Sequence, residues 1–501
     1  MPFRLRPTAA FGAATLLAAC AGSVPRPPAA PIRVGLYAAP LSLDPHVENE
    51  FLTAGVLANA FEGLTTLDAD MRVEPALAVS WDTPGPTTWR FRLRPGARFQ
   101  DGRPVGAADV VWSLERARRH PRSGVSHYLA DVVSVRAPAP DTVEIRTQAS
   151  SSLLLNRLAF VAIVPEASPD DIRVPIGTGP YRLDPAGFPE DLALRRSEVY
   201  WGRQPPEAEI RLRVVREPAR TRAMLEAGEL DVALGIAPAE AARMRAAPCC
   251  RVVAQAAVVV EMLRFRVDRP PFGDPRVRRA VHLALDRPAL VERTLQGWGV
   301  PASQLASPGT VGFSPALSVP ARDVPAARRL LAEAGYPRGL SVTLDYREDR
   351  NADEIRRQLA EAGIDVTLRP SSWGDVLARV RSTGPLFYYG AFVADSGDAG
   401  DILDSAVHTP EPAAGLGVDN HFGYSSPEVD RLLLAARIAP TLLDRRQALQ
   451  RVMERVMVDL PMVPLVVPYD LYVLRRDVRW TPRLDGRVLA ADLAREPGGR
   501  P

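Results

Sequence analysis

The sequence predicts an α/β protein, because segments with the period of a strand alternate with segments with the period of a helix. Trp89, Phe91 and Leu93 alternate with arginines, which predicts a half-buried strand. Residues 107–116 then place valine and leucine at helical spacing, after Pro-Gly and Asp-Gly turns. The 501 residues have room for two or three domains.

The same alternation continues through the rest of the chain. We expect further strands at residues 32–37, 142–147, 209–215, 231–235, 251–256, 258–265, 341–346, 365–369 and 386–392. We expect helices at residues 218–227, 275–285, 351–362 and 373–381. The proline- and glycine-rich stretch 301–320 is expected to be a loop or connector.

The N-terminus has the features of an export signal. Two arginines precede a short apolar stretch at residues 9–17, and Leu-Ala-Ala-Cys, ending at Cys20, resembles a lipidation signal. The apolar stretch is too short to span a bilayer, so we expect residues 1–19 to be a cleaved signal peptide. Cys20 would carry the lipid anchor, and residues 20–31 would be a proline-rich tether. The alternative is an ordinary signal peptide in which Cys20 has no role.

The composition excludes several functions. The chain has 62 basic and 59 acidic residues, so it lacks the basic excess of a nucleic-acid-binding protein. Every basic residue is arginine, which excludes a P-loop lysine and a Schiff-base lysine. The cysteines have no metal-ligand spacing, and the adjacent Cys249 and Cys250 form either a strained disulfide or two small residues that enter a strand.

A search for catalytic motifs finds none. The chain has no G-x-S-x-G elbow, no G-x-G-x-x-G after a strand and no H-E-x-x-H, and its six histidines lack ligand spacing. We therefore expect a binding protein and not an enzyme, with no catalytic residues, no cofactor and no resident metal.

Several sequence blocks resemble one family. They include residues 56–117, the Gly-Thr-Gly-Pro-Tyr turn at 177–181, DPRVRRAVHLALDRPALV from Asp274, and RRLLAEAGYP at 328–337. Together with later blocks they cover residues 32–470, and they resemble the family 5 extracellular solute-binding proteins. These are the dipeptide, oligopeptide and nickel receptors of ABC importers.

The resemblance implies a two-lobed fold of the type II periplasmic-binding-protein kind, with a ligand cleft between the lobes and an extra domain. Lobe I would contain residues 32–45, 180–265 and 468–501. The extra domain would contain residues 46–179, and lobe II residues 266–467.

The resemblance also implies a function. The protein would be a periplasmic, lipid-anchored, monomeric receptor that closes by hinge bending around a di- or oligopeptide. Its other partners would be the permease and ATPase subunits of the importer. Alternative solutes are a nickel chelate, haem or an opine-like molecule, and the alternative of another class is an exported hydrolase.

The resemblance to family motifs predicts which residues bind the ligand. The segment Phe392–Asp398 resembles the Trp-x-Gly-Asp-x-Gly-Asp segment of dipeptide receptors, which assigns Asp395 to the ligand ammonium and Phe392 to the cleft. Asp398 would be a loop or capping acid. Arg347 and Arg350 fall where dipeptide receptors place the partner of the ligand carboxylate.

Three further residues are weaker candidates for the cleft. Trp373 resembles an aromatic residue of the cleft wall, and Asp44 lies in a turn that resembles a cleft-lining turn. Arg266 stands where the family commonly has asparagine, and it would reshape ligand choice if it faced the cleft. Gly177 and Gly179 are the candidate hinge, because glycine permits backbone rotation.

Overall fold

One twelve-stranded sheet runs through the described part of this computed structural model, which comprises residues 30–347, 351–380 and 387–496. Its first strands along the chain are β1 (Ile32–Leu36), β8 (Tyr181–Asp184), β9 (Asp191–Arg196), β10 (Glu209–Val214), β11 (Val232–Ala233) and β12 (Cys250–Ala256). The others are β13 (Val259–Phe265), β14 (Gly299–Pro301), β15 (Leu340–Tyr346), β16 (Ile364–Pro370), β17 (Phe387–Val393) and β18 (Met462–Arg475). Their order is β16-β15-β17-β13-β18-β11-β1-β10-β9-β8, and β12 and β14 also pair with β18.

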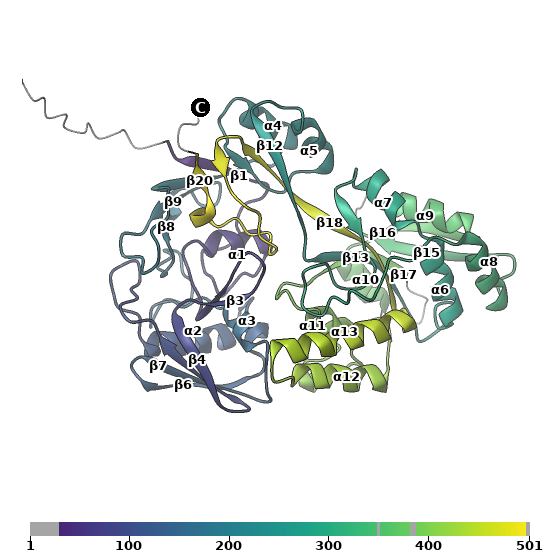
Figure 1. Ribbon diagram of the computed structural model, residues 1–501, viewed down its shortest axis with the longest axis horizontal. Coiled ribbons are helices and arrows are strands. Elements are labelled where there is room, and N and C mark those ends of the chain that lie inside the picture. The colour runs from purple at the N-terminus through teal and green to yellow at the C-terminus, as the bar shows by residue number, and fades with distance from the viewer. Residues whose placement is uncertain (1–29, 348–350, 381–386, 497–501) are drawn as a thin grey trace, which may run out of the picture.

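The sheet divides into two lobes along β18 (Figure 1). We call the part built on β1 and β8 to β12 lobe I, and the part built on β13 to β17 lobe II. The expected lobe I boundary at residue 265 therefore moves to the crossing before β13, because β13 (Val259–Phe265) pairs with β17. The strand β18 belongs to both, because its residues up to Val466 pair with β13 and those from Tyr469 onward pair with β12.

Lobe I is held together by a core between its sheet and short helices. Ile32 of β1 and Ile210 of β10 are fully buried neighbours in a parallel pair. The helix α1 (Phe51–Leu57) contributes Leu52 and Val56 to the same core. The helices α4 (Pro218–Glu226) and α5 (Pro238–Met244) and the hairpin β19 (Val478–Arg479) and β20 (Ala494–Arg495) complete the lobe.

The extra domain is a four-stranded antiparallel sheet covered by a helix. The strands β4 (Ala78–Gly85), β5 (Thr88–Leu93), β7 (Thr142–Thr147) and β6 (Val132–Ala139) follow each other in this order, and α2 (Ala107–Arg119) packs on them. The domain also contains β2 (Thr65–Leu67), β3 (Val73–Pro75) and α3 (Leu154–Leu158). The alternation predicted for β5 is confirmed, because Phe91 and Leu93 are buried while Arg90 and Arg92 are exposed.

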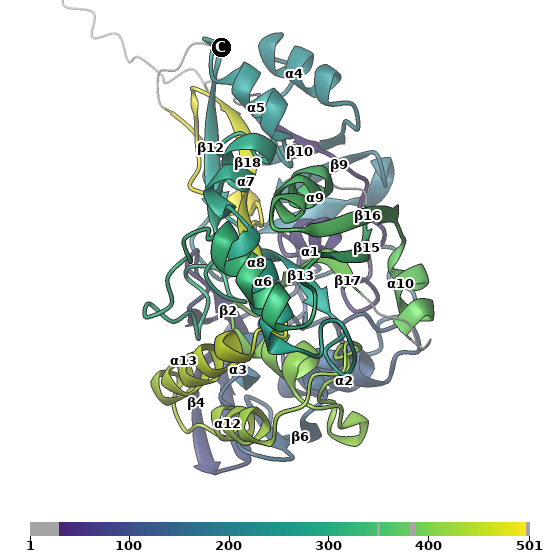
Figure 2. The same ribbon diagram turned by 90° about the vertical axis from the view of Figure 1, so that its right-hand side faces the viewer.

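Lobe II has a helical layer on each face of its strands (Figures 1 and 2). The helices α6 (Pro275–Ala284), α7 (Arg287–Thr294), α8 (Val324–Glu333), α9 (Asn351–Glu361) and α10 (Trp373–Val380) belong to its first part. The helices α11 (Gly400–Ile402), α12 (Pro427–Arg437) and α13 (Leu442–Asp459) follow. The C-terminal end of α12 contacts the extra domain, because Arg437 of α12 forms a 3.3 Å ion pair with Asp131 of that domain.

Two chain segments cross between the lobes side by side. One is residues 257–258 between β12 and β13, and the other is residues 467–468 inside β18. The amide of Ala257 donates to the carbonyl of Pro468 at 3.0 Å, so the crossings are joined to each other. Pro468 has no N–H to give to a ladder, and at this position β18 changes its partner from β13 to β12. These two crossings connect the lobes within the twelve-stranded sheet.

The predicted hinge glycines, Gly177 and Gly179, lie against Ala60 and not at these crossings. A Cβ on Gly177 would lie 2.0 Å from the carbonyl oxygen of Ala60, and one on Gly179 would lie 2.7 Å from the Ala60 carbonyl carbon. Neither glycine has a positive φ. Glycine is therefore needed here for close packing of the extra domain on lobe I and not for backbone freedom.

Of the two alternatives for the adjacent cysteines, the structure has the second. Cys249 and Cys250 are free thiols, and Cys250 begins β12. Burial raises the pKa of the Cys250 thiol to about 12, which keeps it protonated and unreactive.

Candidate ligand pocket between the lobes

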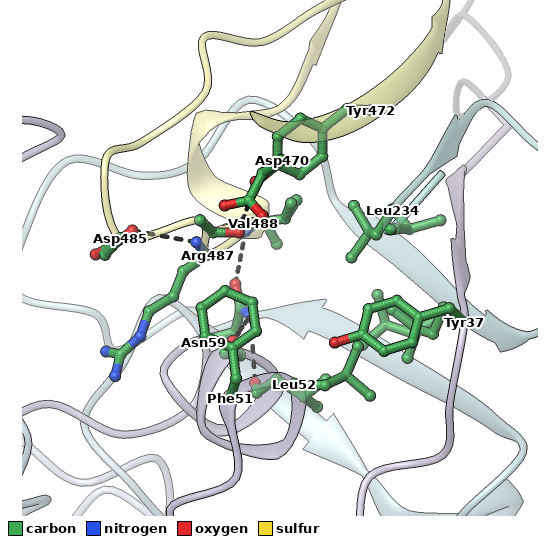
Figure 3. A pocket seen from close by; sticks show the side chains of 18 of the residues that line it. Tyr37, Phe51, Leu52, Asn59, Leu234, Asp470, Tyr472, Asp485, Arg487 and Val488 are labelled. Carbon is green, nitrogen blue, oxygen red and sulfur yellow. Dashed lines mark hydrogen bonds between the residues drawn. The ribbon is translucent and has the colours of Figure 1, made fainter. Parts of the chain in front are cut away.

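A cavity of about 440 Å³ lies where the lobes meet at the crossing strands (Figure 3). Lobe II contributes Val393 and Asp395, and the crossing contributes residues 257–259. Lobe I contributes residues of β1, β9, β10, α1 and β18 and the C-terminal loop at residues 485–488. Most of the lining is apolar, and a few charged side chains stand in it, as in small-molecule sites generally.

Asp395 reaches the pocket because β17 ends just before it. The amide of Ala394 donates to the carbonyl of Val258 at 2.8 Å, which ties this loop to the crossing. The Asp398 carboxylate accepts two hydrogen bonds of 2.8 Å from Arg445 of α13, and both side chains are buried. Asp398 also accepts from the amide of Gly400 at 2.6 Å, so it is a buried structural acid that holds the loop and more than a capping residue.

The Asp395 carboxylate is available to a ligand. Its side chain is exposed to the cavity, and among the described residues it makes no hydrogen bond or ion pair. Removal of water by the surrounding walls raises its pKa, and the charge of Arg487 partly opposes this. A nearby cation stabilises the ionised form of such an acid, so a cationic ligand group would bind favourably here.

Arg487 is the only arginine in the lining of this pocket, within the described residues, and sequence analysis missed it. Its backbone amide donates to Asp485 at 3.1 Å, and Asp485 is itself paired with the buried Arg483 at 2.8 Å. The Arg487 guanidinium lies 4.8 Å from the centre of the Phe160 ring and, in the described part of the chain, has no hydrogen bond or ion pair. The C-terminal segment has no motif that would have identified it.

Phe392 and Trp373 come together, but they do not line this pocket. Side chains alternate along β17, so Phe392 faces the side opposite Val393 and packs in lobe II. Phe392 and Trp373 flank Arg264, whose guanidinium carbon lies 5.8 and 5.9 Å from the two ring centres. Burial lowers the pKa of Arg264, and its Nε has no hydrogen-bond partner among the described residues.

The other predicted arginines lie away from the lining. Arg347 is exposed after β15, and Arg350 lies outside the described residues. Arg266 follows β13 at the end remote from the crossing and pairs with Asp268 at 3.1 Å. The expectation that Arg266 shapes the cleft is therefore corrected: the buried cation beside the two predicted aromatic residues is Arg264.

Asp44 does not line the cleft, and this prediction is also corrected. It is fully buried and accepts a 3.0 Å hydrogen bond from Arg116 of α2, as well as bonds from the amides of His46 and Ile172. Burial alone would raise the pKa of Asp44, but these hydrogen bonds outweigh it and lower the pKa. Asp44 thus joins lobe I to the extra domain.

Two searches of the described residues were negative. No three side chains among His, Cys, Asp and Glu are grouped so that they could hold a metal ion. No helix in residues 30–347, 351–380 and 387–496 has the length and apolar character needed to cross a bilayer.

Two α/β lobes joined by crossing strands, with a charged pocket between them, define a solute receptor of the periplasmic-binding class. Residues 72–413 match the family model for bacterial extracellular solute-binding proteins, family 5 Middle. The chain belongs to this family, which supplies solutes to ABC importers, and it is not an enzyme. Members of the family are extracellular or periplasmic.

The chain is also similar to curated relatives in sequence and to solved structures in fold. The glutathione-binding protein GsiB of Escherichia coli O1:K1 is 28% identical over 447 residues, which are 85% of this chain and 86% of that protein. The structure of HbpA2 from Haemophilus parasuis has a TM-score of 0.84 at 21% identity and covers 93% of this chain and 100% of that one. DppA from Helicobacter pylori, solved with the peptide STSA, has a TM-score of 0.75 at 22% identity and covers 93% and 98%. The predicted type II fold is confirmed.

The buried Asp44–Arg116 pair gives a first prediction. Asp44→Asn leaves the Arg116 charge buried without its counter-ion and should lower the free energy of unfolding by about 3–5 kcal/mol at neutral pH. Urea denaturation measures this loss. Asp82→Asn, which alters an exposed acid of the extra domain, is the control and should change stability little. An Asp44→Asn protein as stable as the wild type would contradict the structural role.

Proposed function

We propose that this protein captures short peptides and delivers them to the permease of an ABC importer. The observation that carries the proposal is two opposite charges in one pocket, Asp395 on lobe II and Arg487 on lobe I, neither of which has an ion-pair partner among the described residues. A free peptide has an ammonium at one end and a carboxylate at the other, so it complements this pair. The apolar remainder of the lining suits side chains.

The comparisons support a peptide ligand. GsiB is named a glutathione-binding protein, and glutathione is a small peptide. DppA of Helicobacter pylori was solved with a peptide bound. Mass spectrometry of the solute that co-purifies with the protein tests the proposal, because a nickel chelate, haem or an opine would be identified directly. A turnover assay on peptides separates a receptor from a hydrolase.

In this proposal the ligand drives closure. A peptide that contacts Asp395 and Arg487 at the same time bridges the two lobes, so it binds the closed form more tightly than the open one. The crossings at residues 257–258 and 467–468 are the proposed hinge. Arg347 and Arg350 of lobe II remain candidates for a second contact to the ligand carboxylate after closure.

We also propose that the protein is a monomer and is anchored to the membrane through lipid on Cys20. The signal peptide at residues 1–19, Cys20 and most of the tether at 20–31 lie outside the described residues. The support is therefore the sequence pattern alone.

Asp395→Asn tests the ammonium site. The variant keeps the shape of the side chain but removes the charge, so the ammonium loses a charged hydrogen-bond partner. The expected loss is on the order of 2–4 kcal/mol, or roughly 30- to 1000-fold in affinity. Calorimetry with the identified peptide measures it.

The control for this variant is Asp365→Asn, because Asp365 is an exposed acid on β16 of the same lobe and does not line the pocket. Its affinity should equal that of the wild type. Equal small losses in both variants would mean that the ligand is held elsewhere.

Closure should be visible in solution. Saturating peptide should reduce the radius of gyration in small-angle X-ray scattering, because the two lobes approach each other around the ligand. Asp395→Asn at the same peptide concentration should scatter like the free protein. An unchanged radius in saturated wild-type protein would rule out hinge closure.

Lipidation predicts where the protein is found in the cell. Cys20→Ala removes the acylated residue, so the protein should move from the membrane fraction to the soluble fraction. Cell fractionation followed by immunoblotting shows the change. Wild-type protein that is already soluble, with a mature N-terminus other than Cys20, would contradict the anchor.

A further inference from the structure

A second unpartnered acid, Asp470, lines the same pocket. It lies on β18 two residues after the crossing at 467–468, within a strand that is otherwise almost entirely apolar. In the described part of the chain its carboxylate has no hydrogen bond or ion pair, and burial raises its pKa to about 6. Placing an unpaired carboxylate in an apolar strand costs free energy, and a cationic ligand group would offset this cost.

The charges of the lining do not balance. The charged residues of the pocket are Asp395, Asp470, Asp485 and Arg487. Asp485 is neutralised by Arg483 at 2.8 Å. A peptide with one ammonium and one carboxylate matches Asp395 and Arg487, and it leaves Asp470 without a counter-charge.

The surroundings of Asp470 suit a cation with an apolar stem. Figure 3 shows Asp470 on one side of the pocket, with Phe51 and Tyr37 on the other side. These two aromatic side chains are 43% and 42% exposed, which is unusual for such large apolar groups. Aromatic faces attract cations and pack against the methylene groups of lysine and arginine side chains.

We propose that Asp470 binds a second positive charge on the ligand, so that the pocket selects short peptides with a lysine or arginine side chain. This inference rests on the proposed peptide function and names the class of peptide. Asp395 binds the ammonium end of the peptide and Arg487 binds its carboxylate end. Asp470 of lobe I forms an ion pair with the cationic side chain.

Isosteric peptides test the charge alone. Citrulline has nearly the shape of arginine but no charge, so calorimetry should compare Ala-Arg with Ala-citrulline and Arg-Ala with citrulline-Ala, using ligand-free full-length protein. The wild type should prefer at least one arginine peptide by roughly 10- to 100-fold over its citrulline partner. Asp470→Asn should reduce this preference to within about threefold and leave the citrulline affinity nearly unchanged.

Glu229→Gln is the matched control, because Glu229 is an exposed acid of lobe I outside the pocket. It should keep the wild-type preference. Asp395→Asn should weaken the arginine and citrulline peptides alike, because it acts on the peptide end and not on the side chain.

The pH dependence has a defined sign. Only ionised Asp470 attracts the cation, so the preference for arginine should shrink as the pH falls from 7 to 5. The other ionisable groups facing it are Tyr37 and Tyr472, whose pKa values are raised, and Asp485 and Arg487 of the C-terminal loop, with Glu50 beside Tyr37. The tyrosines stay neutral over this range.

The outcomes separate the two proposals. Peptide binding without a preference for arginine, or a preference that survives in Asp470→Asn, overturns the role of Asp470 and leaves the peptide receptor standing. Failure of all four peptides to bind, together with a non-peptide solute in the purified protein, overturns the peptide function and the Asp470 inference with it.

Discussion

The rest of the structure depends on the pairing of one strand, β18, with partners in both lobes. Its residues up to Val466 complete the lobe II sheet and those from Tyr469 onward complete the lobe I sheet. Each half is fixed by backbone hydrogen bonds and by buried side chains, which are those of Met462–Val467 and Leu471–Leu474. Between these halves, Val467 and Pro468 pair with β14 of lobe II, and the Pro468 carbonyl accepts from the amide of Ala257 at the proposed hinge. Asp470 lies two residues after Pro468, so a residue of the pocket and the proposed hinge lie on the same strand.

Buried ion pairs keep the charges of the pocket available. Asp395 stands on a loop whose other acid, Asp398, is neutralised by Arg445 in the core. Arg487 stands on a loop whose acid, Asp485, is neutralised by Arg483. Without these internal partners, Asp485 would be free to pair with Arg487, and Asp398 would compete with Asp395 for a ligand cation. Breaking such a buried pair is strongly destabilising, so the order of both loops depends on the stability of the fold.

The sequence predicts the elements of this fold better than its contacts. Periodicity is local, so the strand around Phe91 and the position of Asp395 after a strand could be predicted from neighbouring residues. The role of Asp44 could not be predicted, because its partner Arg116 lies 72 positions away and only the folded chain joins them. The role of Arg487 could not be predicted either, because Arg487 lies on a C-terminal loop that has no motif and only the folded chain brings this loop to the pocket. Asp470 did leave a signal, a single acid inside an apolar strand.

The distribution of charge over the lobes makes closure depend on the ligand. Asp395 belongs to lobe II, whereas Asp470 and Arg487 belong to lobe I. Closing the lobes over a solute would remove water from the pocket, and electrostatic interactions strengthen as the dielectric falls. In the proposed binding mode the ligand ammonium pairs with Asp395, the side-chain cation pairs with Asp470, and the ligand carboxylate pairs with Arg487. A ligand that satisfies only one lobe has the same affinity for the open and closed forms and shifts no population. In this proposal the closed form binds most tightly those ligands that carry charges of both signs at the right separation, and a short peptide has this property.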